Sequence, residues 1–134
     1  MGRPVLKRLK SFFSAEDGAT TIEALLWLPL FIGMLAATVD VSLIFNAQSR
    51  ILGIVQDVDR AYSVGRFEND EDTMARLRAL LPYDETTYTI DTQVTDGIIE
   101  TRVTIPMSEL VATGLFTRVL NMDLTVHDYR YMES

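Results

Sequence analysis

The sequence predicts an α+β fold in which a long N-terminal helix, transmembrane at its start and amphipathic further on, packs on a small antiparallel sheet. Three observations predict it. An apolar run with one acidic interruption spans residues 24–45. Apolar residues then recur at helical spacing over residues 51–62. Two alternating runs follow, separated by Asp96-Gly97, and this is the pattern of a β-hairpin.

Composition limits the classes of function. The chain has 134 residues, a net charge of −7 and no cysteine. The lack of cysteine excludes disulfides, cysteine-ligated zinc and thiol catalysis. An acidic chain repels nucleic-acid phosphates, so we expect no nucleic-acid partner.

The apolar run has the length of a membrane-spanning helix. No charged residue lies between Ala24 and Val39, and the run resumes after Asp40. About 20 helical residues cross the ~30 Å hydrocarbon core of a bilayer. A buried helix of a soluble protein is the alternative, but the rest of the chain is too small to surround a helix that is apolar on every face. Pro29 is tolerated in a membrane helix, and Gly33 is a small residue against which another helix can pack.

The distribution of charge predicts the orientation of the span. Four basic and two acidic residues precede the run, whereas eight basic and fifteen acidic residues follow Asp40. Basic residues before a span favour keeping that end in the cytoplasm, so we expect the acidic bulk of the chain to be exported. A removable secretory signal is the alternative. The run is long for a signal core, and no A-x-A-like site follows it.

Small residues before the run mark a candidate cleavage site. A cut between Gly18 and Ala19 would remove a basic leader and leave a new α-amino group on Ala19. Glu23 would become the fifth residue, in the first helical turn, where the helix dipole favours a carboxylate by about 0.3–1 kcal/mol. A carboxylate in lipid costs about 2.5–3.5 kcal/mol near the bilayer centre and less toward the interface. Glu23 therefore needs a cation, and the amine of Ala19 in the same or a neighbouring subunit is the nearest candidate.

Each acid at an end of the run has an alternative interpretation. Glu23 is either the partner of that amine or an interfacial acid that merely begins the helix. Asp40 either lies at the outer headgroup level with no specific partner or pairs with a basic side chain of another subunit.

These features together resemble the prepilin class of type IV pilus and type II secretion proteins. More narrowly, the segment GATTIEALLWLPLFIGMLAATVDV resembles the TadE-like pseudopilins of the tight-adherence (Flp) pilus, which share its Leu-Pro step and the acid that ends the span. The resemblance covers about residues 10–60. Ala24 departs from the aromatic residue that the prepilin motif prefers after the glutamate, and Ala19 departs from the phenylalanine of ordinary type IV pilins.

The part after the span predicts a compact exported unit. A helix over residues 46–64 is expected to stop at Gly65, and a second helix, capped by Asn69 or Asp70, to end before Pro82. The residues expected on the apolar faces of these helices are Ile51, Ile54, Val55, Val58, Tyr62, Met74, Leu77 and Leu81. Two strands flank the hairpin turn, residues 108–120 form a short helix or a covering loop, and a last strand follows.

The residues that could support catalysis or bind a metal do not have the spacing in the sequence that a catalytic or metal site needs. His127, the single histidine, neighbours Asp128 in an expected strand, so their side chains point to opposite faces. The acids around Asp70 lack the glycine and the ligand spacing of an EF-hand loop, and helix-start chemistry explains them. We therefore expect no enzyme activity, no metal, no cofactor and no small-molecule substrate.

The predicted organisation has four parts. Residues 1–18 form a cytoplasmic leader that is cleaved, 19–45 the transmembrane helix, 46–66 its continuation outside the cytoplasm, and 67–134 a small α+β domain.

The resemblance implies a pilin-like fold and a structural role as a minor pseudopilin in tight-adherence pilus assembly. It also implies a single-pass position in the bacterial inner membrane, with the C-terminal domain in the periplasm, and either inclusion in the surface pilus or a role in starting its assembly only. The implied partners are a prepilin peptidase, other pilins or pseudopilins, the assembly platform and membrane lipid. An uncleaved, signal-anchored binding module of the envelope is the alternative.

Overall fold

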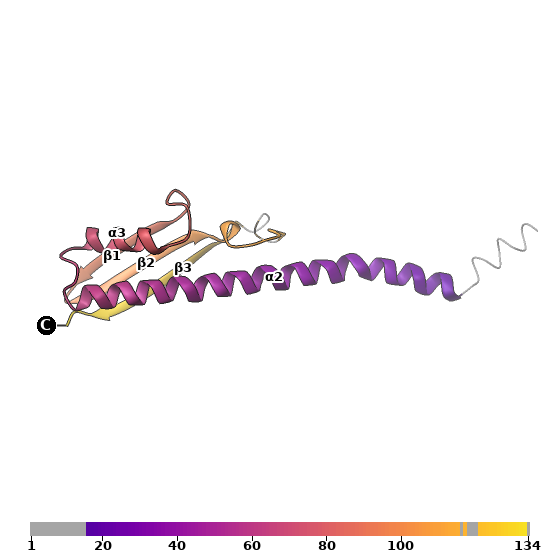
Figure 1. The fold of residues 1–134 in the computed structure, drawn as a ribbon. Helices are drawn as coiled ribbons and strands as arrows, with labels where there is room; N and C mark the ends of the chain where they lie inside the picture. Colours follow the sequence, from indigo (N-terminus) through magenta and orange to yellow (C-terminus); the bar gives the residue numbers. More distant parts are fainter. Residues whose placement is uncertain (1–15, 116, 118–120, 134) are drawn as a thin grey trace, which may run out of the picture. The chain divides into compact units, whose positions relative to one another are not determined.

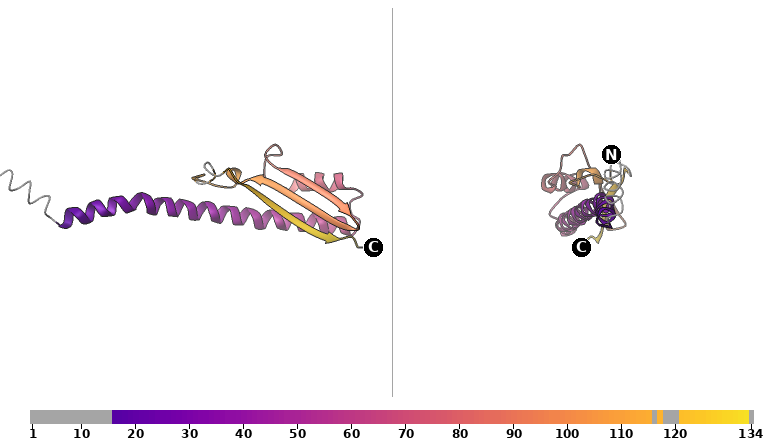
Figure 2. Two further views of the ribbon diagram at one scale, coloured as in Figure 1. Left: turned by 180° about the vertical axis from the view of Figure 1, so that it is seen from behind. Right: turned by 90° about the vertical axis from the view of Figure 1, so that its right-hand side faces the viewer.

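The structure is a computed structural model that describes residues 16–115, 117 and 121–133. It confirms the α+β class, with a long apolar N-terminal helix, a second helix and a three-stranded antiparallel sheet (Figures 1 and 2). The basic residues of the predicted leader lie outside the described residues. The chain divides into two compact units, Met1–Ala36 and Ala37–Ser134, which are described in turn.

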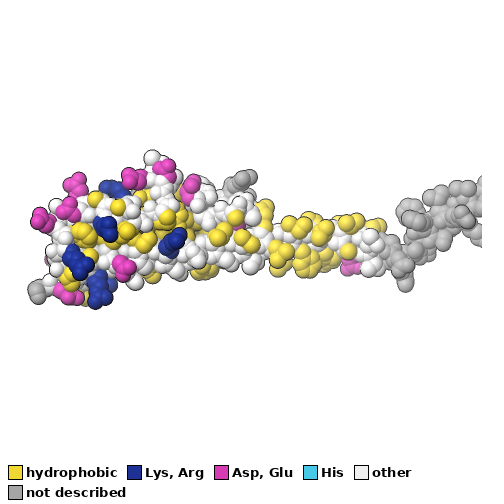
Figure 3. All heavy atoms as spheres, in the orientation of Figure 1, with side chains coloured by type: hydrophobic (Ala, Val, Ile, Leu, Met, Phe, Trp, Pro, Cys, Tyr) yellow, Lys and Arg dark blue, Asp and Glu magenta, His cyan; other side chains and the backbone are white. Residues whose placement is uncertain are grey.

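In the first unit, helix α2 (Glu16–Ser63) begins and carries its apolar residues on all sides. The helix continues through Pro29, as expected for an apolar span. Its large apolar side chains are exposed, and Leu26 reaches 72% exposure. Figure 3 shows hydrophobic side chains covering this part of α2, with one acidic side chain near its start.

In the second unit, α2 turns one face toward a sheet. From Ala47 on, a buried apolar residue recurs every three or four positions, at Ala47, Ile51, Val55, Val58 and Tyr62, and the buried Asp40 lies seven residues, about two turns, before Ala47. Such a spacing places side chains on one stripe of a helix. The predicted amphipathic half is therefore confirmed.

The end of α2 follows from Gly65. This glycine has a φ of +77°, a conformation that L side chains rarely adopt. Its N–H donates to the Tyr62 carbonyl at 2.9 Å, and the Arg66 N–H donates to the Ala61 carbonyl at 3.0 Å. These two bonds form a Schellman motif and satisfy carbonyls at the helix end. The predicted stop at Gly65 is confirmed.

Helix α3 (Asp70–Leu80) begins at a side-chain cap. The Asn69 side chain accepts a hydrogen bond from the Asp72 N–H at 2.8 Å, which satisfies one of the free donors of the first turn. Of the two residues predicted as possible caps, Asn69 is therefore the one that caps the helix. Leu77 of the helix and Leu81, its C-cap residue, are both buried.

The sheet is antiparallel, in the order β1-β2-β3. Its strands are β1 (Thr89–Thr95), β2 (Ile98–Pro106) and β3 (Asp123–Tyr131). Asp96 and Gly97 both have positive φ, as a type I′ hairpin turn requires. The hairpin predicted at this dipeptide is confirmed.

The core of the second unit lies between the helices and one face of the sheet. Alternate residues of β2, Ile99, Thr101, Val103 and Ile105, are buried there. Leu124 and Val126 of β3 join the same core, whereas Tyr129 and Tyr131 are exposed. The core thus fixes the register of β2 and β3, because a slip by one residue would expose the whole apolar set.

The segment between β2 and β3, for which a short helix or a covering loop was expected over residues 108–120, is described only in part. The short 3-10 helix η1 (Met107–Glu109) follows β2, and Leu110 is buried behind it. Residues 111–114 then form an irregular loop. Part of the rest of this segment lies outside the described residues.

Candidate functional site

The predicted cleavage site lies at the beginning of the described chain. Gly18 and Ala19 lie in the first turns of α2, which begins at Glu16. Their roles stay a prediction, because a cut would be the act of another protein.

Glu23 is an exposed acid among exposed apolar side chains. Ile22 and Leu25 beside it are each 62% exposed. Within the described part of the chain, neither of the two ion pairs involves Glu23. A carboxylate in such surroundings gains most from a cation supplied from outside the described chain, which is what the predicted register role requires.

Gly33 leaves the helix surface open. A Cβ atom added at Gly33 would meet nothing within 4 Å. The glycine is therefore not needed to fit any described part of this chain. Its predicted role in packing against another helix stays a prediction.

Asp40 is bound by a loop of the same chain. Its Oδ1 accepts from the backbone N–H groups of Ala112 at 3.2 Å and Thr113 at 2.9 Å. Its Oδ2 accepts from the Thr113 hydroxyl at 2.5 Å and the Gly114 N–H at 3.1 Å. The side chain is only 4% exposed. Three successive N–H groups facing one carboxylate form an anion-binding nest.

The conformation of Gly114 helps to form this nest. Its φ is +63°, in the left-handed region that favours glycine. The turn of the chain at this residue lets consecutive N–H groups point to the same side. We call Asp40 with Ala112, Thr113 and Gly114 the Asp40 anchor. It attaches the loop to α2 at the first buried position of the helix.

The sequence did not indicate these partners of Asp40. A headgroup position and a cation of another subunit were the interpretations available, and neither included donors about seventy residues further along the chain. The signal that was available is the spacing: Asp40 precedes Ala47 by seven residues and Ile51 by eleven, on the buried stripe.

A second buried acid, Asp59, was not predicted as special. It is fully buried, and its Oδ1 accepts from the Thr101 hydroxyl at 2.7 Å. The Thr92 hydroxyl lies 3.3 Å from that of Thr101, so the hydroxyls connect α2 with β2 and β1. Burial raises the pKa of Asp59 to about 6, although the Thr101 hydrogen bond lowers it, and the Asp128 carboxylate adds to the rise.

The described residues form no cluster of metal ligands. Among residues 16–115, 117 and 121–133, no group of three or more His, Asp or Glu side chains is placed to hold a metal ion. His127 stacks on Tyr129 with ring centroids 6.4 Å apart and lies on the outer face of the sheet. What the structure offers instead is a helix for lipid or other helices and a folded unit fixed to its second half. Helix α2 is the one helix in the described part of the chain that is long and apolar enough to cross a membrane.

Comparisons with known proteins agree with this geometry. Residues 18–58 match the family model described as TadE-like protein. Searches of curated proteins and of solved structures gave no match. The matched segment begins at Gly18 and contains Glu23 and Asp40. The resemblance predicted from the sequence is therefore confirmed over residues 18–58, which are similar to TadE-like proteins.

Proposed function

We propose that the protein is a minor pseudopilin that acts structurally in the assembly of a tight-adherence (Flp-type) pilus. A prepilin peptidase cuts the precursor between Gly18 and Ala19. The observation that carries the proposal is the family match, which starts at Gly18 and runs along the exposed apolar helix into the folded unit.

The span holds the protein in the inner membrane, with its N-terminus in the cytoplasm and its folded unit in the periplasm. The positive charge before the span favours this orientation. Within the predicted transmembrane helix, residues 19–45, we assign residues 20–39 to the hydrocarbon core, because they span about 30 Å in a helix. The Asp40 anchor then lies at the outer boundary, where the folded unit begins.

Assembly proceeds by packing of apolar helices. Once the leader is removed, the new amine of Ala19 supplies the cation that Glu23 lacks, in the same subunit or the next. This ion pair selects one axial register, because a shift would leave a carboxylate unpaired in an apolar layer. Gly33 lets a neighbouring helix of a pilin, a pseudopilin or the assembly platform come close.

The N-terminal residue of the membrane-bound protein tests the proposal. The full chain is produced with and without a prepilin peptidase, and its intact mass is measured. We expect a start at Ala19 only when the peptidase is present, and no cut in a Gly18→Leu variant. A chain that starts at Met1 in both samples would instead indicate a signal-anchored binding module.

A further inference from the structure

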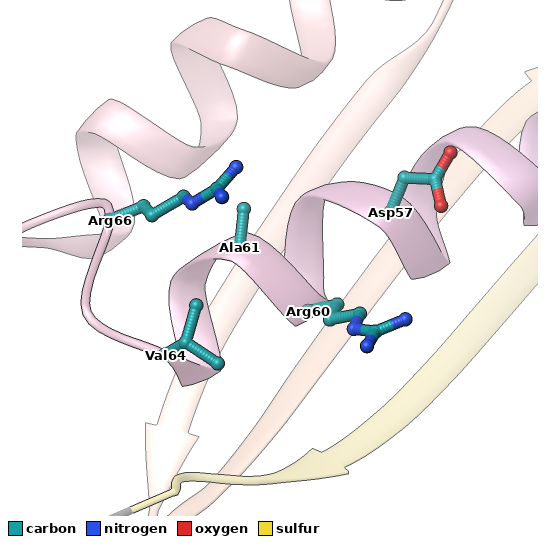
Figure 4. A pocket seen from close by; sticks show the side chains of 5 residues that line it. All are labelled: Asp57, Arg60, Ala61, Val64 and Arg66. Atoms are coloured by element: carbon teal, nitrogen blue, oxygen red, sulfur yellow. The ribbon is translucent and has the colours of Figure 1, made fainter.

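A groove lined by three arginine side chains runs along the end of α2, the turn that follows it and α3. Two adjoining cavities of about 560 Å³ and 310 Å³ share part of their lining there. We call them together the α2–α3 groove. Six of its residues carry the argument: Arg60, Ala61, Val64, Arg66, Arg76 and Leu80. Figure 4 shows Arg66 reaching from the turn toward Ala61, while Arg60 projects from α2.

The charged residues that line the groove are mainly basic, although the chain as a whole is acidic. Arg60, Arg66 and Arg76, here called the groove arginines, are all exposed, and Asp57 is the one acid that lines the cavities. The two ion pairs among the described residues use Arg102 and Arg130, so the groove arginines have none. Guanidinium groups gathered in one groove repel one another and bind carboxylates strongly, often through two parallel hydrogen bonds. The groove therefore favours an acidic ligand.

The apolar residues of the groove favour a protein segment over a free ion. Val64 is 49% exposed and Leu80 is 39% exposed, and Ala61 lines both cavities. Figure 3 shows basic and hydrophobic side chains intermixed over α2 and α3 on this side of the molecule. Basic groups around an apolar surface match a partner that carries acids beside apolar or small side chains.

The first turn of α3 has this chemistry. Glu68, Glu71 and Asp72, here called the acidic turn, are exposed; Glu71 and Asp72 lie in the first turn of α3, and Glu68 directly precedes its Asn69 cap. Asp70 is not included, because it accepts a hydrogen bond of 2.6 Å from the Tyr62 hydroxyl. The Asn69 cap uses only a backbone N–H of Asp72, so the Asp72 carboxylate is not part of the cap. Ala75, a small exposed residue, follows Glu71 by four residues and lies on the same side of α3.

We propose that the α2–α3 groove of one copy binds the acidic turn of a second copy of this chain. Helical spacing places Glu71 and Ala75 on one side of α3 and the groove residues Arg76 and Leu80 on another, so each bound copy keeps one of these two surfaces free for a further copy. A contact of this head-to-tail kind repeats and builds rows of subunits instead of closed pairs. Charge complementarity selects the partner, and the apolar residues of the groove add buried area.

Disulfide crosslinking between two tagged full-length copies tests the proposal, since the chain contains no cysteine. One copy carries Val64→Cys in the groove, and the other carries Ala75→Cys beside the acidic turn. Both are produced in membranes without a prepilin peptidase, so the result does not depend on processing. We expect a disulfide-linked pair of the two tags after mild oxidation, with a yield that falls as salt is raised from 50 to 500 mM, because salt weakens exposed charge pairs.

Charge reversal identifies the contact. Arg66→Glu in the first copy, or Glu71→Arg in the second, is expected to lower the crosslink yield about fivefold or more, and the two together to restore it. Arg66→Gln is a milder second variant, and Arg102→Glu on the outer face of the sheet is the matched control that leaves the yield unchanged. Protease resistance of each variant shows that it is folded. The proposal would be overturned if no crosslink formed, or if the crosslink joined the chain to another protein in place of the second copy. It would also be overturned if neither charge reversal lowered the yield, or if combining Arg66→Glu with Glu71→Arg did not restore it.

Discussion

Thr113 binds the carboxylate of Asp40 twice, through its backbone N–H at 2.9 Å and through its hydroxyl at 2.5 Å. The two residues are 73 positions apart, and the bonds connect the long helix with the loop between β2 and β3. Hydrogen bonds to a charged acceptor contribute more to stability than neutral ones, about 1.5–3 kcal/mol each. The Asp40 anchor is therefore a strong polar contact between distant parts of the sequence.

Replacing Asp40 by Asn is expected to destabilise the folded unit by about 1–3 kcal/mol, because one oxygen that accepts hydrogen bonds becomes a donor facing N–H groups. Thr113→Val should have a smaller effect, since only the hydroxyl is lost. Thermal unfolding of the full chain in detergent measures both. Ser42→Ala is the control, because Ser42 donates only to the Thr38 carbonyl of its own helix at an exposed position. Equal unfolding temperatures for Asp40→Asn and the unchanged protein would show that the anchor adds nothing.

Asp59 is expected to make the stability of the folded unit depend on pH. It lies outside the residues assigned to the hydrocarbon core, and its pKa of about 6 in the folded chain exceeds the ordinary value of 3.8. The folded state therefore holds the proton more tightly than the unfolded state. The stability that this gives is fully present below pH 3.8 and is lost as the pH rises through about 6.

The variant Asp59→Asn isolates this effect. Its amide oxygen can still accept from the Thr101 hydroxyl, but no charge has to be buried. We expect it to be more stable than the unchanged protein at pH 7 by on the order of 1–2 kcal/mol, which allows for screening around the partly exposed Arg130, and about equal at pH 4. Chemical unfolding at several pH values measures the difference. Asp57→Asn, an exposed acid of the same helix, is the control. The role assigned to Asp59 is wrong if both variants show the same pH profile.

The cap of α3 gives a prediction for the second helix. Asn69→Ala removes the acceptor of the Asp72 N–H and is expected to cost about 1 kcal/mol. Asn69→Asp or Asn69→Ser should keep most of the stability. Hydrogen exchange at the amide of Asp72 is a local readout, and it should become faster in the alanine variant alone. Unchanged exchange would mean that another group protects this amide.

A substitution of Glu23 is expected to block pilus assembly without affecting peptidase processing. In Glu23→Leu, the peptidase still finds Gly18 and Ala19, but the cation of the new N-terminus has no partner, so we expect a normal cut and loss of pilus assembly. The amount of surface pilus and the intact mass of the protein are measured together. Asp123→Leu, an exposed acid of β3 far along the chain from the span, is the control. Normal pilus formation by Glu23→Leu would contradict the register role.

Much of the fold was predictable because local signals decide it. Gly65, Asn69 and Asp96-Gly97 act on their own neighbours in the chain, so their effects are readable from a few residues. The alternation in β2 was equally informative, because a single face of that strand is buried. The apolar span was recognisable from length alone.

The polar contacts inside the folded unit were not predictable in the same way. The donors of Asp40 come from a loop whose conformation depends on Gly114 and on the packing of β2 and β3. Asp59 is buried only because β2 and β3 place Thr101 and Asp128 against that turn of α2. Asp40 and Asp59 lie on or beside the apolar stripe of α2. This position relative to the stripe is the one signal in the sequence that indicates their burial. The groove arginines likewise come together through the turn that joins α2 to α3.

The last residues of β3 return to the end of α2. The Glu133 N–H donates to the Ser63 carbonyl at 3.1 Å, and the Met132 N–H donates to the Gly97 carbonyl at 2.8 Å. Along the helix axis, Ser63 lies about 35 Å from Asp40 at 1.5 Å per residue. Fluorescent probes on cysteines introduced at positions 42 and 133 would therefore form a molecular ruler within a chain that has no cysteine of its own. Energy transfer between them would report, in living cells, whether this half of the helix stays straight.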